Sequence, residues 1–191
     1  MSGIIGDIGS KSGRIGPRLT GPIALIKAAS GMSIINLTNA TWVINKSLSS
    51  IEIDTHQCCS ISGSTGNYGH IFTVPAGYAG IYYVHAQAGF YNDDNNIKDI
   101  RCSIAKIGSG GSAPTNSAGM FCTGYQKINY PSADEHRDRH AAVSQEVVMN
   151  CIAGDRIECW VYTNHANGTT SINEDGENKR NNKLLVEYRG I

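Results

Sequence analysis

A cluster of acidic and amide side chains lies at Asn92 to Asn96 and contains Asp93 and Asp94, with Asp99 a few positions on. Oxygen atoms of these types are what a hard cation such as Ca²⁺ binds. The cluster lacks the ligand spacing and the final glutamate of an EF-hand loop. Asn and Asp also stabilise turns by bonding to nearby backbone groups. The pattern therefore favours a solvated turn over a calcium site, and no bound metal or other cofactor is expected.

Two histidines, His136 and His140, lie four residues apart within the charged segment 134–140. In a helix this spacing would let both bind one metal ion, but no third ligand and no metalloprotease spacing accompanies them. Charged residues on an exposed strand edge block pairing with other chains. An exposed loop or strand edge is the favoured interpretation.

The segment from Asn164 to Asn182 is polar and is expected to be a loop. Loops at the end of a rigid sandwich often carry recognition. With an aromatic platform from Tyr162 or Trp160, this loop could bind a sugar, although a solvated loop is favoured. A host surface glycan is therefore one partner to consider.

The sequence contains none of the common motifs for nucleophilic catalysis or metal binding. No G-x-S-x-G, P-loop, dinucleotide-binding or H-E-x-x-H motif is present, so the sequence predicts a protein that is not an enzyme. The six cysteines form no CxxC pair and match no common zinc module. The favoured interpretation is that the cysteines are small buried side chains with free thiols. They are Cys58, Cys59, Cys102, Cys122, Cys151 and Cys159.

The composition limits the classes of partner. The 191 residues fit one domain with an additional arm. The formal net charge of +0, without a basic patch, argues against nucleic-acid binding. No apolar run is long enough to insert into a membrane. No secretory signal peptide is visible at the N-terminus, which favours folding in a cytosol. The 22 glycines indicate many turns.

Three segments carry the strand pattern most clearly: 70–84, 147–161 and 183–191. In the first, Phe72 and Val74 alternate with polar neighbours before Pro75 and Gly77 end the run. In the second, an Ala-Gly-Asp turn separates two apolar runs, so strand, tight turn, strand is expected, and a long hairpin. Many short strands between turns predict an all-β antiparallel sandwich.

These three segments, in this order, resemble those of the C1q/TNF-like jelly roll, across residues 34–191. The resemblance implies a jelly-roll knob that is not an enzyme and that forms a homotrimer around a threefold axis. Aromatic and aliphatic side chains would form the trimer interface, and some would instead fill the core. Tyr82 and Tyr83 point to opposite faces of a strand, so one should be core. The interface candidates are Phe72, Tyr82, Tyr83, Tyr125, Leu185 and Tyr188.

Residues 1–31 differ from the 32–191 knob because isoleucines are threaded between frequent glycines. A free tail would rarely be so apolar, so an extended N-terminal arm that packs on its own domain or docks on a partner is expected. Within it, residues 22–29 could form a short helix. The segment 8–16 resembles short segments of tailed-phage virion proteins. The partner-binding candidates are Ile4, Ile5, Ile8, Arg14, Ile15 and Leu19.

These features predict a phage virion protein, assembled in the host cytoplasm and placed on the virion surface. An arm of this length spans at most roughly 100 Å and carries no coiled-coil or collagen repeat. A knob that decorates or cements the capsid, held to the major capsid protein by its arm, is favoured on that ground. A tail fibre or spike head that binds the host receptor is the first alternative. A soluble C1q-like glycan-binding module is the second.

Overall fold

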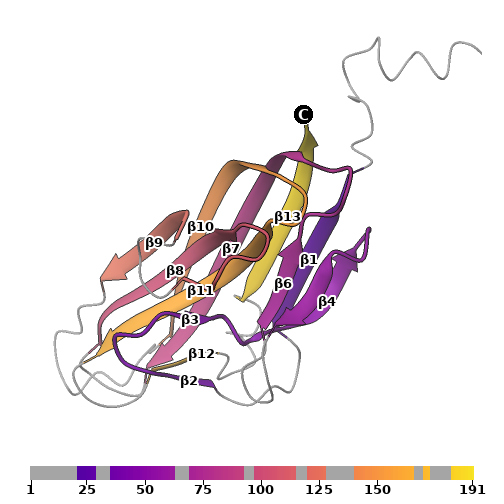
Figure 1. Ribbon diagram of the computed structural model, residues 1–191. Coiled ribbons are helices and arrows are strands. Elements are labelled where there is room, and N and C mark those ends of the chain that lie inside the picture. Colours follow the sequence, from indigo (N-terminus) through magenta and orange to yellow (C-terminus); the bar gives the residue numbers. More distant parts are fainter. Residues whose placement is uncertain are drawn as a thin grey trace, which may run out of the picture.

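The chain folds as two antiparallel sheets stacked face to face (Figure 1). The computed structural model describes residues 21–28, 35–62, 69–92, 97–114, 120–127, 140–165, 170–172 and 182–191. Within these ranges every regular element is a strand. The predicted all-β sandwich is confirmed.

The first sheet, sheet A, is centred on the long strand β7. β10 pairs with one side of β7, and β13 and β12 pair with the other side, one after the other along its length. β1 then lies between β13 and β4, and β2 pairs with β12. The strands are β1 (Ile23–Ala28), β2 (Ile35–Leu37), β4 (Leu48–Asp54), β7 (Gly80–Asn92), β10 (His140–Cys151), β12 (Thr170–Ile172) and β13 (Lys183–Gly190).

The second sheet, sheet B, has the strand order β5-β6-β11-β8-β9, and β3 also pairs with β11. Its centre is the long pairing of β11 with β8. The strands are β3 (Val43–Ile44), β5 (Cys59–Ser62), β6 (Gly69–Thr73), β8 (Ile97–Ile107), β9 (Cys122–Lys127) and β11 (Arg156–His165).

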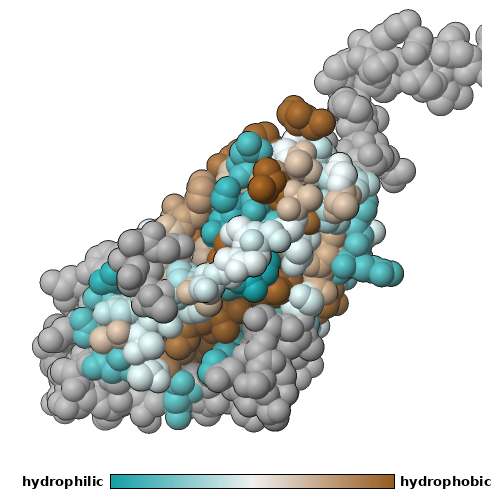
Figure 2. Space-filling model, in the orientation of Figure 1, coloured by the Kyte–Doolittle hydropathy of each residue, from teal (hydrophilic) through white to brown (hydrophobic). Residues whose placement is uncertain are grey.

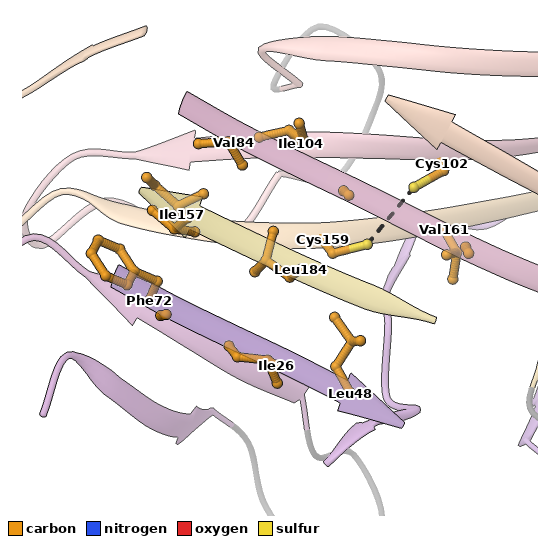
Figure 3. Close-up of a cluster of buried hydrophobic side chains, with 14 of the residues drawn as sticks. Ile26, Leu48, Phe72, Val84, Cys102, Ile104, Ile157, Cys159, Val161 and Leu184 are labelled. Carbon is orange, nitrogen blue, oxygen red and sulfur yellow. Dashed lines mark hydrogen bonds between the residues drawn. The ribbon is translucent and has the colours of Figure 1, made fainter. Parts of the chain in front are cut away.

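The core lies between the sheets because each strand turns alternate side chains inward. Tyr82 and Val84 of β7 are 0 % exposed, whereas Tyr83 between them is half-buried on the outer face. This confirms that Tyr82 and Tyr83 point opposite ways. Figure 3 shows Phe72 and Leu184 among the side chains that meet in this space.

The two turn motifs connect the sheets rather than forming hairpins within one sheet. The first joins β6 of sheet B to β7 of sheet A, and the second joins β10 of sheet A to β11 of sheet B. The expected long hairpin around Gly154 is therefore wrong. The two corners are bonded to each other: Val74 N donates to Asp155 O, and Gly154 N donates to Val74 O, each at 2.9 Å.

The predicted boundary between arm and knob at residue 31 is too late. Residues 23–28 form β1, which pairs with β4 and β13 inside sheet A. The possible short helix at 22–29 is also wrong, because the segment has a period of two. Ala24 and Ile26 are 0 % exposed and face the core, while Ile23 and Leu25 lie on the other face. The arm candidates from Ile4 to Leu19 lie outside the described residues.

Candidate self-association interface

The outer face of sheet A presents one continuous row of side chains across five strands. His85 of β7 lies opposite Glu146 of β10 and, on its other side, opposite Leu185 of β13. Leu185 lies opposite Leu25 of β1, which lies opposite Ile53 of β4. Directly opposed residues in antiparallel strands share a face. The row therefore runs from a charged edge at β10 to an apolar edge at β4.

A second row lies beside the first on the same face. Val148 of β10 lies opposite Tyr83, which lies opposite Glu187 of β13, and Glu187 lies opposite Ile23 of β1. We call the outer face of sheet A formed by these two rows the A face. On it, Ile53 is 42 % exposed and Val148 62 %. Single-chain soluble proteins rarely expose a broad apolar area unless it binds a partner.

Polar contacts fix the aromatic side chain in the middle of the A face. The Tyr83 hydroxyl donates a 2.7 Å hydrogen bond to Glu146 Oε2, and this bond, followed by burial, raises the pKa of Tyr83. The Arg189 guanidinium lies 5.3 Å from the Tyr83 ring centre and pairs with Glu187 at 2.8 Å. Tyr83 is thus held in one position before any partner arrives.

The predicted interface residues divide between the core and the A face. Phe72 and Tyr82 are wrong as interface residues: both are 0 % exposed in the single chain, with ring centres 5.8 Å apart. They point inward because their strands turn that face toward the other sheet. Tyr83 and Leu185 lie on the A face, and Leu185 is half-buried.

The remaining two candidates lie away from the middle of the A face. Tyr188 is half-buried and packs against Tyr82 and Tyr78, at ring-centre distances of 5.3 Å and 5.7 Å. Tyr125 lies in β9 of sheet B, opposite Arg101 in the register, and its side chain is outside the described residues. Neither is part of the A face.

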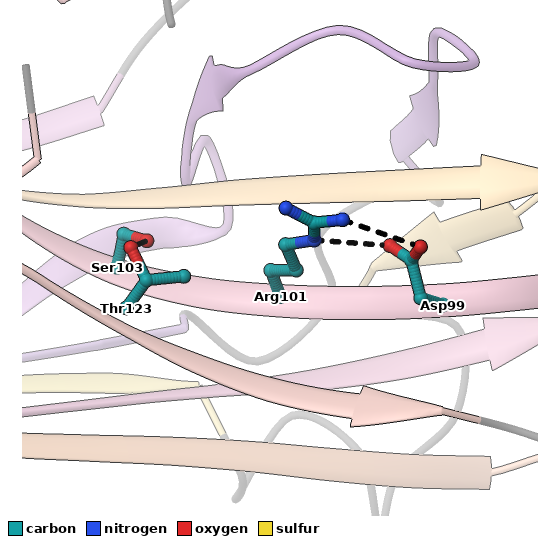
Figure 4. A network of polar contacts seen from close by, with 4 residues as sticks. All are labelled: Asp99, Arg101, Ser103 and Thr123. Atoms are coloured by element: carbon teal, nitrogen blue, oxygen red, sulfur yellow. Dashed lines mark hydrogen bonds and ion pairs between the residues drawn. The ribbon is translucent and has the colours of Figure 1, made fainter. Parts of the chain in front are cut away.

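The acidic cluster is only partly within the described residues. Asp93 and Asp94 lie outside them. Asp99 is 7 % exposed and accepts hydrogen bonds from Arg101 Nε at 3.1 Å and Nη2 at 3.4 Å (Figure 4). Across the described ranges, no group of three or more His, Cys, Asp or Glu residues is placed to hold a metal ion. The Asp99 carboxylate is bound by a guanidinium.

The other candidate sites are limited by their secondary structure and burial. His140 begins strand β10, and His136 lies outside the described residues. Trp160 is 8 % exposed, and its indole N–H donates to Glu158 Oε2 at 2.8 Å. This side chain is therefore wrong as a sugar platform. Tyr162 is half-buried, 5.1 Å from the Trp42 ring.

The cysteines behave as small core residues. Cys102 and Cys159 are 0 % exposed, with Sγ atoms 3.8 Å apart (Figure 3), and Cys151 is 1 % exposed. All six thiols are free, as expected. Burial raises the pKa of Cys58 to about 11 and that of Cys59 to about 12. These thiols stay protonated near neutral pH and are weak nucleophiles.

Asp54 explains the position of the adjacent pair Cys58 and Cys59. Its Oδ1 accepts from Cys58 N at 2.8 Å, and its Oδ2 accepts from Cys59 N at 2.9 Å. Burial alone would raise the pKa of Asp54, but these backbone N–H groups outweigh it and lower the pKa. The carboxylate thus fixes the turn from β4 to β5.

We expect Asp54→Ala to lower the free energy of unfolding by about 1 kcal/mol near neutral pH, since the carboxylate is partly exposed and screened. The lowered pKa means that the contribution is present above the unfolded-state pKa and is lost as pH falls through the lower folded-state pKa. Urea unfolding from neutral to acidic pH measures both effects. A variant whose deficit did not shrink on acidification would contradict this account. Glu52→Ala, on the same strand, removes a carboxylate that pairs with Lys27 at 2.6 Å, and it measures the smaller cost of losing an exposed ion pair for comparison.

Sequence reasoning missed most of the A face. Leu25 falls within the predicted arm, and Ile53, His85 and Val148 are not among the predicted site residues. For Leu25, the signal that could have found it is the period of two in β1, which places it on the face away from the core.

No protein-family model and no curated protein matches this sequence. Solved structures do match it. Eiger TNF from S. frugiperda aligns with a TM-score of 0.57 at 10 % identity, covering 88 % of this chain and 92 % of that one. Murine APRIL aligns with a TM-score of 0.53 at 12 % identity, covering 86 % and 96 %. The fold is a TNF-like jelly roll. The globular domain of zebrafish complement 1qA aligns with a TM-score of 0.48 at 10 % identity, covering 87 % and 95 %.

This fold was predicted from the corner motifs, and the jelly-roll sandwich is confirmed. At these identities the likeness establishes the architecture. Among the described residues, no helix is long and apolar enough to cross a membrane.

Proposed function

We propose that this chain is a non-enzymatic structural knob that forms a homotrimer through the A face. The observation that carries the proposal is the exposure of Ile53 and Val148 beside half-buried Leu25 and Leu185. Burying apolar surface contributes about 25 cal/mol per Å², so covering this face would drive association. The C1q/TNF-like resemblance of the sequence favours three copies.

The A face is suited to a closed ring. In a threefold ring each subunit uses two different patches, one for each neighbour. The A face has two such patches: Ile53 and Leu25 on the β4 side, and Val148 on the β10 edge. Seating the β10 edge of one copy against the β4 side of the next would cover both.

We further propose that the trimer is a virion component that decorates or cements the capsid through its N-terminal segment. The support is the resemblance of residues 8–16, within this N-terminal segment, to parts of phage virion proteins. The root of that segment is fixed on the knob, because Gly21 packs against Tyr188 and Tyr188 N donates to Pro22 O at 3.0 Å. Three arms on one trimer would strengthen weak individual contacts by multivalency.

Substituting Ile53 with lysine is expected to convert the trimer to single chains at micromolar concentration. A charge buried in the interface without a partner costs about 3 kcal/mol or more for each subunit contact. The fold should persist, since Ile53 is partly exposed in the single chain. Sedimentation equilibrium measures the mass, which for the wild type should be three times 20.5 kDa.

Ile152→Lys is the matched control. Ile152 is 62 % exposed but belongs to the corner between β10 and β11, not to the A face. Hydrophobic residues are also exposed at the end of the sandwich that carries the C-terminus (Figure 2). This variant should remain trimeric. A wild-type mass of one chain would overturn the trimer, and a trimeric Ile53→Lys variant would show that the A face is not its interface.

Imaging of purified particles tests the virion assignment. Copies at regular positions over the head would support decoration or cementing. Copies confined to the tail would instead support a fibre or spike head, and absence from particles would overturn the assignment.

A further inference from the structure

His85 lies near the middle of the A face. It projects outward from β7, the strand that lies between β10 and β13 in sheet A. Its neighbours in the sequence, Val84 and Ala86, are 0 % exposed and face the core, while the His85 side chain is half-buried. Any copy that covers the A face would cover this imidazole.

The groups around His85 give it little room for a positive charge. Lys183 of β13 lies on the same face, diagonally across from His85, and its charge disfavours a protonated imidazole. Glu146 of β10 lies directly opposite His85, and its charge favours the protonated form. Glu146 already accepts the Tyr83 hydroxyl at 2.7 Å. Of the other charged residues on or beside the two rows, Glu187 of β13 pairs with Arg189. Lys27 of β1 lies opposite Lys183 and pairs with Glu52 at 2.6 Å.

Burial, followed by the charge of Lys183, lowers the pKa of His85 already in the single chain, despite Glu146. Covering the A face removes more water from the ring, which disfavours the charged form further. The folded chain and its assembly therefore bind the proton less readily than the unfolded chain.

We infer that His85 makes assembly through the A face sensitive to acid: the neutral imidazole permits the trimer, and its protonation separates the subunits. The inference rests on the proposed trimer. A group whose pKa is lower in the assembly than in the free chain favours the free chain as pH falls through the free-chain pKa. If each of three copies loses about one pKa unit on assembly, the trimer formation constant falls by about 10³ across that range.

Sedimentation equilibrium at about pH 7.5 and about pH 5 tests this, because an ordinary histidine titrates between those values. The wild-type formation constant should fall by at least about 10²-fold, while that of His85→Gln should change by less than about 3-fold. His56→Gln is the control, because the His56 ring pairs with Tyr78 at 3.0 Å and lies off the two rows. It should follow the wild type.

Lys183→Met tests whether the charge of His85 matters, because the pH midpoint of dissociation would not shift in this variant if His85 had only a structural role. Removing this cation raises the pKa of His85, so the dissociation midpoint should shift to higher pH. NMR titration of the His85 ring in the wild-type protein should follow dissociation. This measurement needs no variant, so it still tests the inference if a variant folds poorly. Circular dichroism at each pH separates dissociation from unfolding.

Each outcome is decisive. A wild-type trimer with the same formation constant at both pH values overturns the inference and leaves the trimer intact. If acid weakens the His85→Gln trimer as much as the wild-type trimer, other groups cause the acid sensitivity, and the inference is again overturned. A wild-type protein that is a single chain at about pH 7.5 overturns the trimer, and with it the inference.

Discussion

Replacing Gly80 with alanine is expected to lower the free energy of unfolding by about 3 kcal/mol or more. A Cβ at Gly80 would lie 2.4 Å from the backbone oxygen of Gly190 and 3.0 Å from Tyr188 Cε2. The oxygen belongs to the end of β13, so it cannot rotate away as a side chain would. The φ of +151° adds a conformational cost for any residue with a Cβ.

Gly77→Ala separates the two costs. Gly77 also has a positive φ, +85°, but no atom lies within 4 Å of its ideal Cβ position. This variant should lose only about 1–2 kcal/mol, from conformation alone. Urea unfolding of both variants gives the comparison. Equal losses would show that the close approach of β7 to β13 at Gly80 contributes nothing.

Phe72→Ala is expected to cost about 3–5 kcal/mol, the usual range for truncating a fully buried aromatic residue. Phe72 is 0 % exposed in the core and meets the Tyr82 ring edge-on. Tyr82 in turn contacts Tyr188, and its hydroxyl donates to Tyr78 O at 2.8 Å. A cavity at Phe72 would therefore loosen the aromatic cluster between the sheets.

Phe121→Ala is the natural comparison, because Phe121 is 48 % exposed. Its loss should cost less than about 1 kcal/mol. Thermal and urea unfolding measure both variants. If the two substitutions had similar effects, the assignment of Phe72 to the core would be wrong.

The two corner motifs show how far the sequence could predict the fold. Pro75, Gly77 and Gly154 mark where strands end, because these residues favour turns. The alternation beside them marks which side chains share a face. Neither signal tells which sheet a strand joins, since sheet membership depends on distant pairing such as that of β7 with β10. The strands on either side of the two corners are therefore predicted correctly, whereas the hairpin is not.

The candidate interface was harder to predict for the same reason. Phe72 and Tyr83 are both aromatic and both lie in strands, yet only Tyr83 lies on the outer face. Residue type does not separate a core aromatic from a surface one until the core side of each strand is known. The strand that carries Ile23 and Leu25 was missed for another reason. The glycines on its N-terminal side make the whole region resemble an extended arm.

The place of β13 between β7 and β1 has a consequence for how the protein is made. On a ribosome, β1, β4 and β7 emerge long before residues 183–190, which sheet A needs between β7 and β1. Until then the nascent chain holds strands with unpaired edges and exposed apolar side chains, a state that recruits chaperones and aggregates readily. Contacts between such distant parts of a chain also slow folding. Sheet A can therefore be completed only after residues 183–190 have left the ribosome, and the folding yield should depend on how quickly β13 pairs with β7 and β1.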